Sequence, residues 1–175
     1  MLGMISMKPM SGYEIKQSME KSLGYFWQES YGQIYPTLKI LEIEGLVKSK
    51  SKLQSKGVEK IIYSITSLGE KELVGWLKKE VEIPIYRNEL LLKLFFGKKI
   101  SVTENLKHLE SQKLKTEKSV SKFEDILKKG NKLYSKNPNQ LFWLSTVKYG
   151  IEIFKAELKW IESTKKEFES LNSSK

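Results

Sequence analysis

Residues 30–47, SYGQIYPTLKILEIEGLV, decide the fold, because they predict one short helix with a marked start and a marked end. Ser30 followed three residues later by Gln33 is a capping-box pattern, in which each side chain bonds to the backbone amide of the other residue. Gly45 stands where a residue in the left-handed conformation would end the helix, and an extended segment follows it.

The two faces of this helix differ. Ile34, Leu38 and Leu41 recur at steps of four and three and predict a face turned to the core. Off that face, near the helix N-terminus, lie aromatic, amide and lysine side chains, which suit phosphates and base edges in a DNA major groove. They are Tyr31, Gln33, Tyr35, Pro36 and Lys39. Any small surface helix can expose such residues, so the neighbouring segments have to decide.

The preceding segment, residues 11–23 (SGYEIKQSMEKSL), predicts a second capped helix. Ser11 and Glu14 form its capping box, and apolar residues recur every fourth position from Ile15. The connection at residues 24–29 is short, and we expect its Phe26 and Trp27 to fill the joint between the helices. Two capped helices joined by a brief turn are typical of a helix-turn-helix, with the second as recognition helix.

The following segment predicts a basic β-hairpin. Residues 46–53 and 58–65 have strand-like sequences, and residues 54–57 (QSKG) suit the tip. Even spacing within each strand puts its lysines on one face, so the hairpin would form the wing of a winged helix-turn-helix and reach the phosphate backbone. Lysines on an edge hairpin also protect against aggregation, which remains the alternative. The lysines are Lys48, Lys50, Lys52, Lys56 and Lys60.

These segments together resemble the PadR family of bacterial transcriptional regulators. The resemblance rests on PMSGYEIK at residues 9–16, FW at 26–27, SYGQIYPTL at 30–38, EGLV at 44–47 and YSITSL at 63–68. It implies a homodimeric winged-helix repressor, which in some members leaves its operator when a phenolic or drug-like molecule binds. The rest of the chain, beginning with NELLLKLFF at residues 88–96, is similar to the longer members, which carry a helical C-terminal dimerisation domain.

The resulting expectation is a mostly α-helical protein with a small β-wing. We expect a winged-helix DNA-binding domain at residues 1–82 and a long-helix dimerisation domain at residues 83–175. Double-stranded operator DNA and a second copy of the chain are the expected partners, with a small aromatic effector as a third. The residues assigned to DNA contacts are Tyr13, Lys16, Ser30, Tyr31, Gln33, Tyr35, Pro36, Lys39, Lys52, Lys56 and Lys60.

The sequence departs from the family pattern in three ways. Ile40 and Ile43 stand where members often carry Arg or Glu, which would remove a phosphate contact and widen the apolar face. Residues 1–6 (MLGMIS) supply only the end of the first helix that members usually have. A later start codon or a shortened chain would produce such a start. Arg87 is the single arginine, so bidentate guanine readout by arginine is not expected from the recognition helix.

The second half predicts long helices. Thr66 can cap a helix at residues 68–80, which Trp76 and Leu77 would anchor. Pro84 marks a hinge, and residues 87–97 predict a short, very apolar helix. A capping box at Ser101 opens a long helix to about residue 129. A polar loop at 130–137 and then Asn137 and Pro138 would lead into the last helix.

Both long helices carry a seam with steps of three and four residues, as in a coiled coil. The first seam comprises Val102, Leu106, Leu109, Lys113, Thr116, Val120, Phe123 and Leu127, and the second continues to Lys165 and Phe168. The seams could pair within one chain. However, Leu114, Ile126, Leu141, Phe142, Tyr149 and Trp160 lie outside them, and exposed apolar patches usually mark an interface. The predicted dimer contact is Leu144, Val147, Ile151, Phe154, Leu158 and Ile161.

Composition argues against an enzyme. The chain has no Cys, one His (His108) and one Asp (Asp125), too few for a metal site or a catalytic triad, so no catalytic residue, metal or cofactor is expected. The absence of Cys fits a reducing cytoplasm, and no run is apolar enough for a membrane span. Net charge +10 favours a polyanionic partner. The alternative function is a winged-helix protein–protein adaptor, which would not show the steep salt dependence of a DNA complex.

Overall fold

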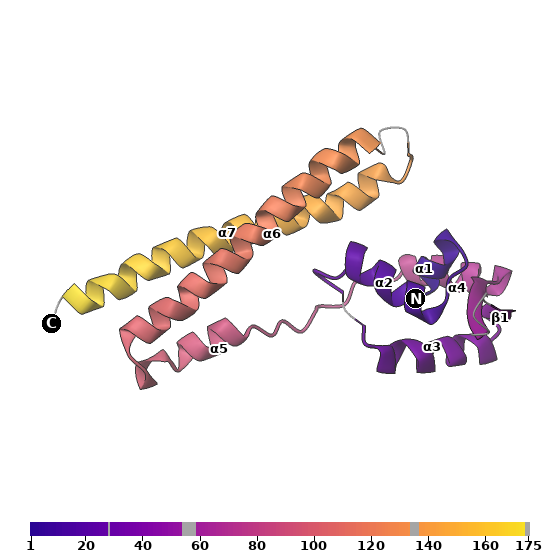
Figure 1. Ribbon diagram of the computed structural model, residues 1–175, viewed down its shortest axis with the longest axis horizontal. Helices are drawn as coiled ribbons and strands as arrows, with labels where there is room; N and C mark the ends of the chain where they lie inside the picture. The colour runs from indigo at the N-terminus through magenta and orange to yellow at the C-terminus, as the bar shows by residue number, and fades with distance from the viewer. Residues whose placement is uncertain (28, 54–58, 134–136, 174–175) are drawn as a thin grey trace. The chain divides into compact units, whose positions relative to one another are not determined.

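The computed structural model describes residues 1–27, 29–53, 59–133 and 137–173. The chain divides into two compact units, Met1–Ile83 and Pro84–Lys175. Apart from one two-stranded sheet in the first unit, the described secondary structure is helical, as the sequence predicts (Figure 1). No helix among the described residues is long and apolar enough to cross a membrane.

The first unit is a helix-turn-helix followed by a hairpin. Its elements are α1 (Leu2–Met7), α2 (Gly12–Ser22), α3 (Tyr31–Ile43), β1 (Val47–Leu53), β2 (Glu59–Ile65) and α4 (Ser67–Leu77). The strands pair antiparallel, with Val47 opposite Ile65 and Lys52 opposite Lys60. Met10, just before α2, pairs with Tyr63 through two backbone hydrogen bonds and so ties the hairpin to the helices.

The core of this unit joins α1, α2 and α3 to the hairpin. Burial of the core side chains of α3 holds one face of this helix against the unit and leaves the opposite face in solvent. The largest fully buried members are Ile5, Ile15, Ile34, Leu38 and Val47, and Leu23 and Leu41 pack at its edge. The apolar spacings in the two helices therefore predicted the buried face correctly.

Local signals set the ends of these elements. Ser11 and Glu14 form the predicted capping box, with the Ser11 amide donating to the Glu14 carboxylate at 2.9 Å. Gly45 ends α3 with φ +70°, the left-handed conformation that glycine adopts without steric cost. Gly69 lets α4 approach β1 closely, because a Cβ there would lie 2.1 Å from the Leu46 carbonyl oxygen.

Two predictions for this unit need correction, and a third concerns residues that the structure does not describe. Phe26 and Trp27 do not fill the joint between α2 and α3: they are 50% and 51% exposed, and the Trp27 indole donates to Glu29. Trp76 and Leu77 are also exposed and do not anchor α4. The predicted hairpin tip at residues 54–57, with Lys56, lies outside the described residues.

The second unit is a helical hairpin with a short helix at its start. It contains α5 (Glu89–Phe95), the 3₁₀ turn η1 (Gly97–Lys99), α6 (Val102–Leu133) and α7 (Gln140–Ser173). The long helices α6 and α7 run side by side (Figure 1). The helix α6 continues through Gly130, which the sequence pattern had placed in a loop, and α7 starts two residues after Pro138. Gly130 is buried against Leu144, so packing extends the helix there.

The seam of α7 packs against α6 of the same chain. Leu144, Ile151 and Ile161 are buried, and the Phe154 ring meets Phe123 edge-on with 5.3 Å between ring centroids. Val147 and Leu158 are half-buried on the same face. Of the two pairings that the sequence left open, the structure contains the intramolecular one. These six residues therefore stabilise the hairpin within one chain.

Candidate nucleic-acid interface

The exposed face of α3 presents the predicted set of side chains. Tyr31, Gln33, Tyr35, Pro36 and Lys39 are all exposed, while Ile34 and Leu38 between them are fully buried. The helix begins at Ser30, which is exposed as well, so the unpaired amides of the first turn are accessible to an anion. The fold thus presents one complete face and one end of α3 to a partner.

An aromatic cluster joins this face to α2. The rings of Tyr31 and Tyr35 stack with centroids 6.2 Å apart, and the Lys16 ammonium lies 5.9 Å from the Tyr31 ring centroid. Lys16 also pairs with Glu20 at 2.6 Å, and Tyr13 is exposed nearby. Loss of solvent contact is the main cause that raises the pKa of the Tyr31 hydroxyl, so it stays protonated and can donate a hydrogen bond.

Gln33 has only part of its hydrogen-bonding capacity left for a partner. Its Oε1 accepts the Ser30 amide at 2.9 Å and the Ser30 hydroxyl at 3.0 Å. The bidentate contact of glutamine to adenine uses the side-chain oxygen as an acceptor and the amide nitrogen as a donor. As long as the cap holds, Gln33 therefore offers only its Nε2 donor, which suits a phosphate or a base-edge acceptor.

Ile40 and Ile43 do not widen the buried face, contrary to expectation. They are 53% and 77% exposed and extend the outward surface of α3 beyond Lys39. The periodicity alone could have shown this, because neither residue keeps the spacing of Ile34 and Leu38. The outer surface of α3 is consequently more apolar than the resemblance implied.

The wing supplies fewer available cations than predicted. Lys48, Lys50 and Lys52 are exposed on one face of β1. Lys60 faces Lys52 across the hairpin, but its ammonium lies 2.8 Å from the Glu14 carboxylate. That contact, followed by the Ser11 amide, lowers the pKa of Glu14 to about 2. Lys60 thus links the wing to the capping box of α2.

Gly12 is a supporting residue that sequence reasoning missed. A Cβ at this position would lie 2.7 Å from Cε1 of Tyr35 and 3.3 Å from Cδ1 of Leu38. The Tyr35 ring therefore rests directly on the first turn of α2, which fixes its direction. The sequence gives no local signal for this contact, since Gly12 only follows the cap at Ser11.

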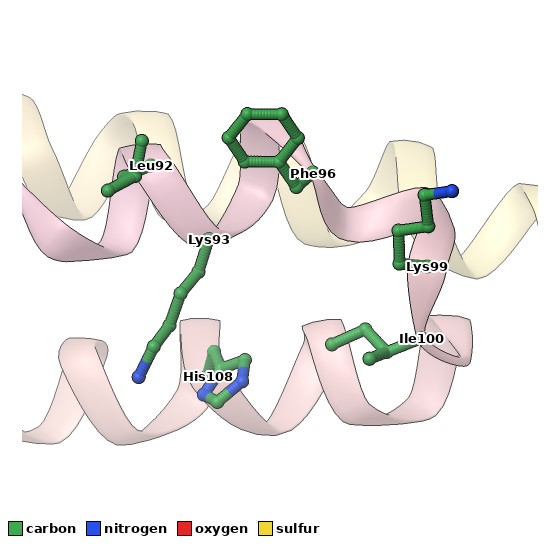
Figure 2. Close-up of a pocket in the computed structure, with 6 residues that line it drawn as sticks. All are labelled: Leu92, Lys93, Phe96, Lys99, Ile100 and His108. Carbon is green, nitrogen blue, oxygen red and sulfur yellow. The ribbon is translucent and has the colours of Figure 1, made fainter.

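A separate cavity of about 370 Å³ lies in the second unit, between α5, η1 and α6. Leu92, Phe96 and Ile100 form its apolar part, and Lys93, Lys99 and His108 also line it. Figure 2 shows the Lys93 side chain extending from α5 toward His108 on α6. The aromatic residues Phe142, Trp143, Tyr149 and Trp160 do not line this cavity and are exposed on α7.

The two units match two known families of sequence. Residues 1–74 match the transcriptional regulator PadR-like family, and residues 86–169 match the virulence activator alpha C-terminal family. The negative transcriptional regulator PadR of Bacillus subtilis is 29% identical over 167 residues, which cover 93% of this chain and 91% of that protein.

Solved structures agree over nearly the whole length. Bacillus subtilis PadR in complex with operator DNA has a TM-score of 0.84 at 29% identity, and the match covers 95% of this chain and 94% of that one. The Streptococcus mutans protein smu.1604c has a TM-score of 0.79 at 32% identity over 93% of this chain and 94% of that one. The fold, the order of the motifs and these matches agree: the chain belongs to the PadR-like family of transcriptional regulators.

Proposed function

We propose that this protein is a homodimeric repressor that binds a palindromic operator through α3. The observation that carries the proposal is the exposed polar and aromatic face of α3, in a chain whose fold matches Bacillus subtilis PadR in complex with operator DNA. As a regulator of transcription it would act in the cytoplasm. The helical arm would hold two copies together, so that two recognition helices enter the major groove about 34–36 Å apart.

We assign different roles to the proposed contacts. Tyr31, Tyr35 and Pro36 offer apolar surface to thymine methyl groups and sugars, while Lys39 and the Nε2 of Gln33 offer donors. The helix α3 carries no arginine, so its contacts to guanine would lack the bidentate fork. Lys52 on β1 and Tyr13 on α2 would hold the phosphate backbone, with Ser30 at the start of α3 and Lys56 of the predicted wing. Lys16 and Lys60 would do so only by exchanging Glu20 and Glu14 for a phosphate.

We place the contact between copies on the second apolar face of α7. Phe142, Tyr149, Ile153 and Trp160 recur at steps of seven and four, and all are exposed in the single chain. At about 100° per residue, this face lies roughly 140° around the helix from the seam that packs on α6. A helix that is apolar on two opposite faces buries both only when a second partner covers the outer one.

We also propose that a small aromatic acid can bind this protein and release it from DNA. Bacillus subtilis PadR has been solved in complex with p-coumaric acid. The cavity between α5 and α6 combines an apolar wall from Phe96 and Ile100 with the cationic Lys93 and Lys99. Such a lining suits a ring that carries a carboxylate. Titration of the DNA complex with p-coumaric acid, with Phe96→Ala as a comparison, tests this part separately.

Selection of bound duplexes from a random library tests the main proposal. We expect one palindromic sequence to be enriched, and Tyr35→Ala and Lys39→Ala to weaken its binding by about 1–3 kcal/mol per base pair whose recognition they support. Lys71→Ala, which removes an exposed lysine on α4, is the matched control. If nothing is enriched, or if the α3 variants bind like the control while remaining folded, α3 is not a recognition helix.

A further inference from the structure

The outer side of α6 carries a row of lysines that the proposed function does not use. Six positions recur along the helix, all exposed, and we call them the lysine face: Lys107, Lys115, Lys118, Lys122, Lys129 and Lys132. Each residue turns the helix by about 100°, and at that rotation the six side chains all project within one sector about 100° wide. The buried Leu109, Thr116 and Phe123 point the other way, into the contact with α7. The lysine face therefore lies opposite the hairpin seam.

Several charges where α6 meets α7 are paired, whereas those of the lysine face are mostly not. Between α6 and α7, Lys113 meets Glu162 at 2.6 Å and Lys155 meets Glu124 at 2.9 Å. Within the described residues, the one ion pair recorded for the lysine face joins Lys129 to Asp125 at 3.6 Å.

The spacing of these lysines also has a cost. Lys115, Lys118 and Lys122 are neighbours three and four positions apart, and like charges at that spacing destabilise a helix. Glu89 on α5 lies near enough to Lys115 to interact with its charge, but within the described residues none of these three lysines forms an ion pair, so an anionic partner would relieve the remaining repulsion.

We propose that the lysine face binds the phosphate backbone of duplex DNA without reading its sequence. This second contact rests on the proposed function, which brings duplex DNA to the protein. From Lys107 to Lys132 the helix rises about 37 Å, close to one turn of duplex. Lysine suits this task because its ammonium is a flexible point charge that needs no fixed geometry.

The distribution of charge favours DNA over the other anionic surfaces. Residues 81–175 hold 19 Lys and Arg against 12 acidic residues, whereas residues 1–80 hold 12 Lys against 9 Glu. In the first unit, moreover, Lys16 and Lys60 are paired with Glu20 and Glu14. A helix that lies on a membrane surface inserts a broad apolar face beside its lysines. The apolar seam of α6 is instead packed against α7, and the exposed Leu114, Ile126 and Leu133 are too few to form a broad face.

The test compares two triple variants of equal charge. K115Q/K118Q/K122Q neutralises the centre of the lysine face, and K71Q/K148Q/K166Q removes three exposed lysines that lie outside this face and outside the proposed contact between copies. Affinity for a random-sequence duplex about three helical turns long is measured as salt is raised. The slope of log affinity against log salt should fall by up to about 2.7 for the lysine-face variant, roughly 0.9 for each phosphate that is no longer neutralised, and should stay unchanged for the control.

Three other results would overturn the proposal. An unchanged slope for the lysine-face variant, with helicity intact by circular dichroism, means that these lysines are only solvated. Equal losses in both variants mean that overall charge acts, not a face. If the variant instead loses binding to vesicles of anionic phospholipid while its DNA slope is kept, the partner is a membrane. If the wild-type protein binds every duplex equally, the proposed function is refuted. The proposal for the lysine face is still tested in that case, because the slope comparison uses random-sequence duplex and needs no operator.

Discussion

A buried polar group in the middle of the helical hairpin gives the sharpest test of the packing. Thr116 occupies a seam position of α6 and is only 2% exposed. Its hydroxyl lies 2.8 Å from Oε2 of Glu157 on α7, and the Gln112 amide donates to Oε1 of the same carboxylate at 3.1 Å. A hydroxyl buried at a helix contact is tolerated because this carboxylate accepts a hydrogen bond from it.

Thr116→Val keeps the shape of the side chain and removes the hydroxyl. Removing a hydrogen bond to a charged acceptor costs about 1.5–3 kcal/mol, and the added methyl group returns about 0.8 kcal/mol of apolar burial. Because Glu157 is only half-buried and keeps Gln112, we expect the net loss to be about 1 kcal/mol. Thr146→Val on α7 is the matched control: its exposed hydroxyl donates to a backbone carbonyl, so stability should change little.

The assay is denaturant unfolding followed by circular dichroism, at one fixed protein concentration because association would shift the transition. A double-mutant cycle with Glu157→Ala isolates the pair, and we expect a coupling free energy of about 1 kcal/mol. A coupling below about 0.3 kcal/mol, within the usual error of additivity, would refute the assignment of this hydrogen bond. So would a Thr116→Val variant more stable than the wild type.

Three further predictions use other contacts. Gly12→Ala should weaken operator binding without unfolding the first unit, since its Cβ would lie 2.7 Å from the Tyr35 ring; unchanged affinity in a gel shift would contradict this. Glu14→Gln should remove about 1 kcal/mol of stability at neutral pH, limited by solvent screening of the pair with Lys60. Because the folded pKa of Glu14 is about 2, that difference should persist above pH 4.5 and vanish as pH falls towards 2, in parallel acid titrations of both proteins. Phe154→Glu should lower helicity, as its ring packs on Phe123, whereas a fully helical monomer in sedimentation would show that Phe154 holds a dimer instead.

Signals confined to a few neighbouring residues predicted the fold well. The capping boxes at Ser11 and Ser101 and the left-handed Gly45 are all present in the structure. Each depends on contacts within four residues, which the chain makes wherever that segment lies. For the same reason, the predicted outer face of α3 is exposed: the spacing of Ile34 and Leu38 sets which way it turns.

Placement that depends on distant segments was not predictable in this way. Phe26 and Trp76 are large and apolar, so burial was the natural expectation, yet both are exposed in the single chain. Gly130 looked like a loop residue, but its lack of a side chain leaves room for Leu144 across the hairpin. The wing also has fewer lysines free to contact DNA than predicted, because Lys60 pairs with Glu14 of α2.

The polar members of the seam explain why α6 and α7 pair within the chain. Lys113 and Lys165 stand at seam positions where apolar residues would suit any helix partner. In this hairpin they meet Glu162 and Glu110, and Thr116 meets Glu157 between them. All of these interactions require the antiparallel order and register of α6 against α7, so another pairing of these faces would leave half-buried charges without partners. The seam is therefore specific for the hairpin, which agrees with our proposal that copies meet on the second apolar face of α7.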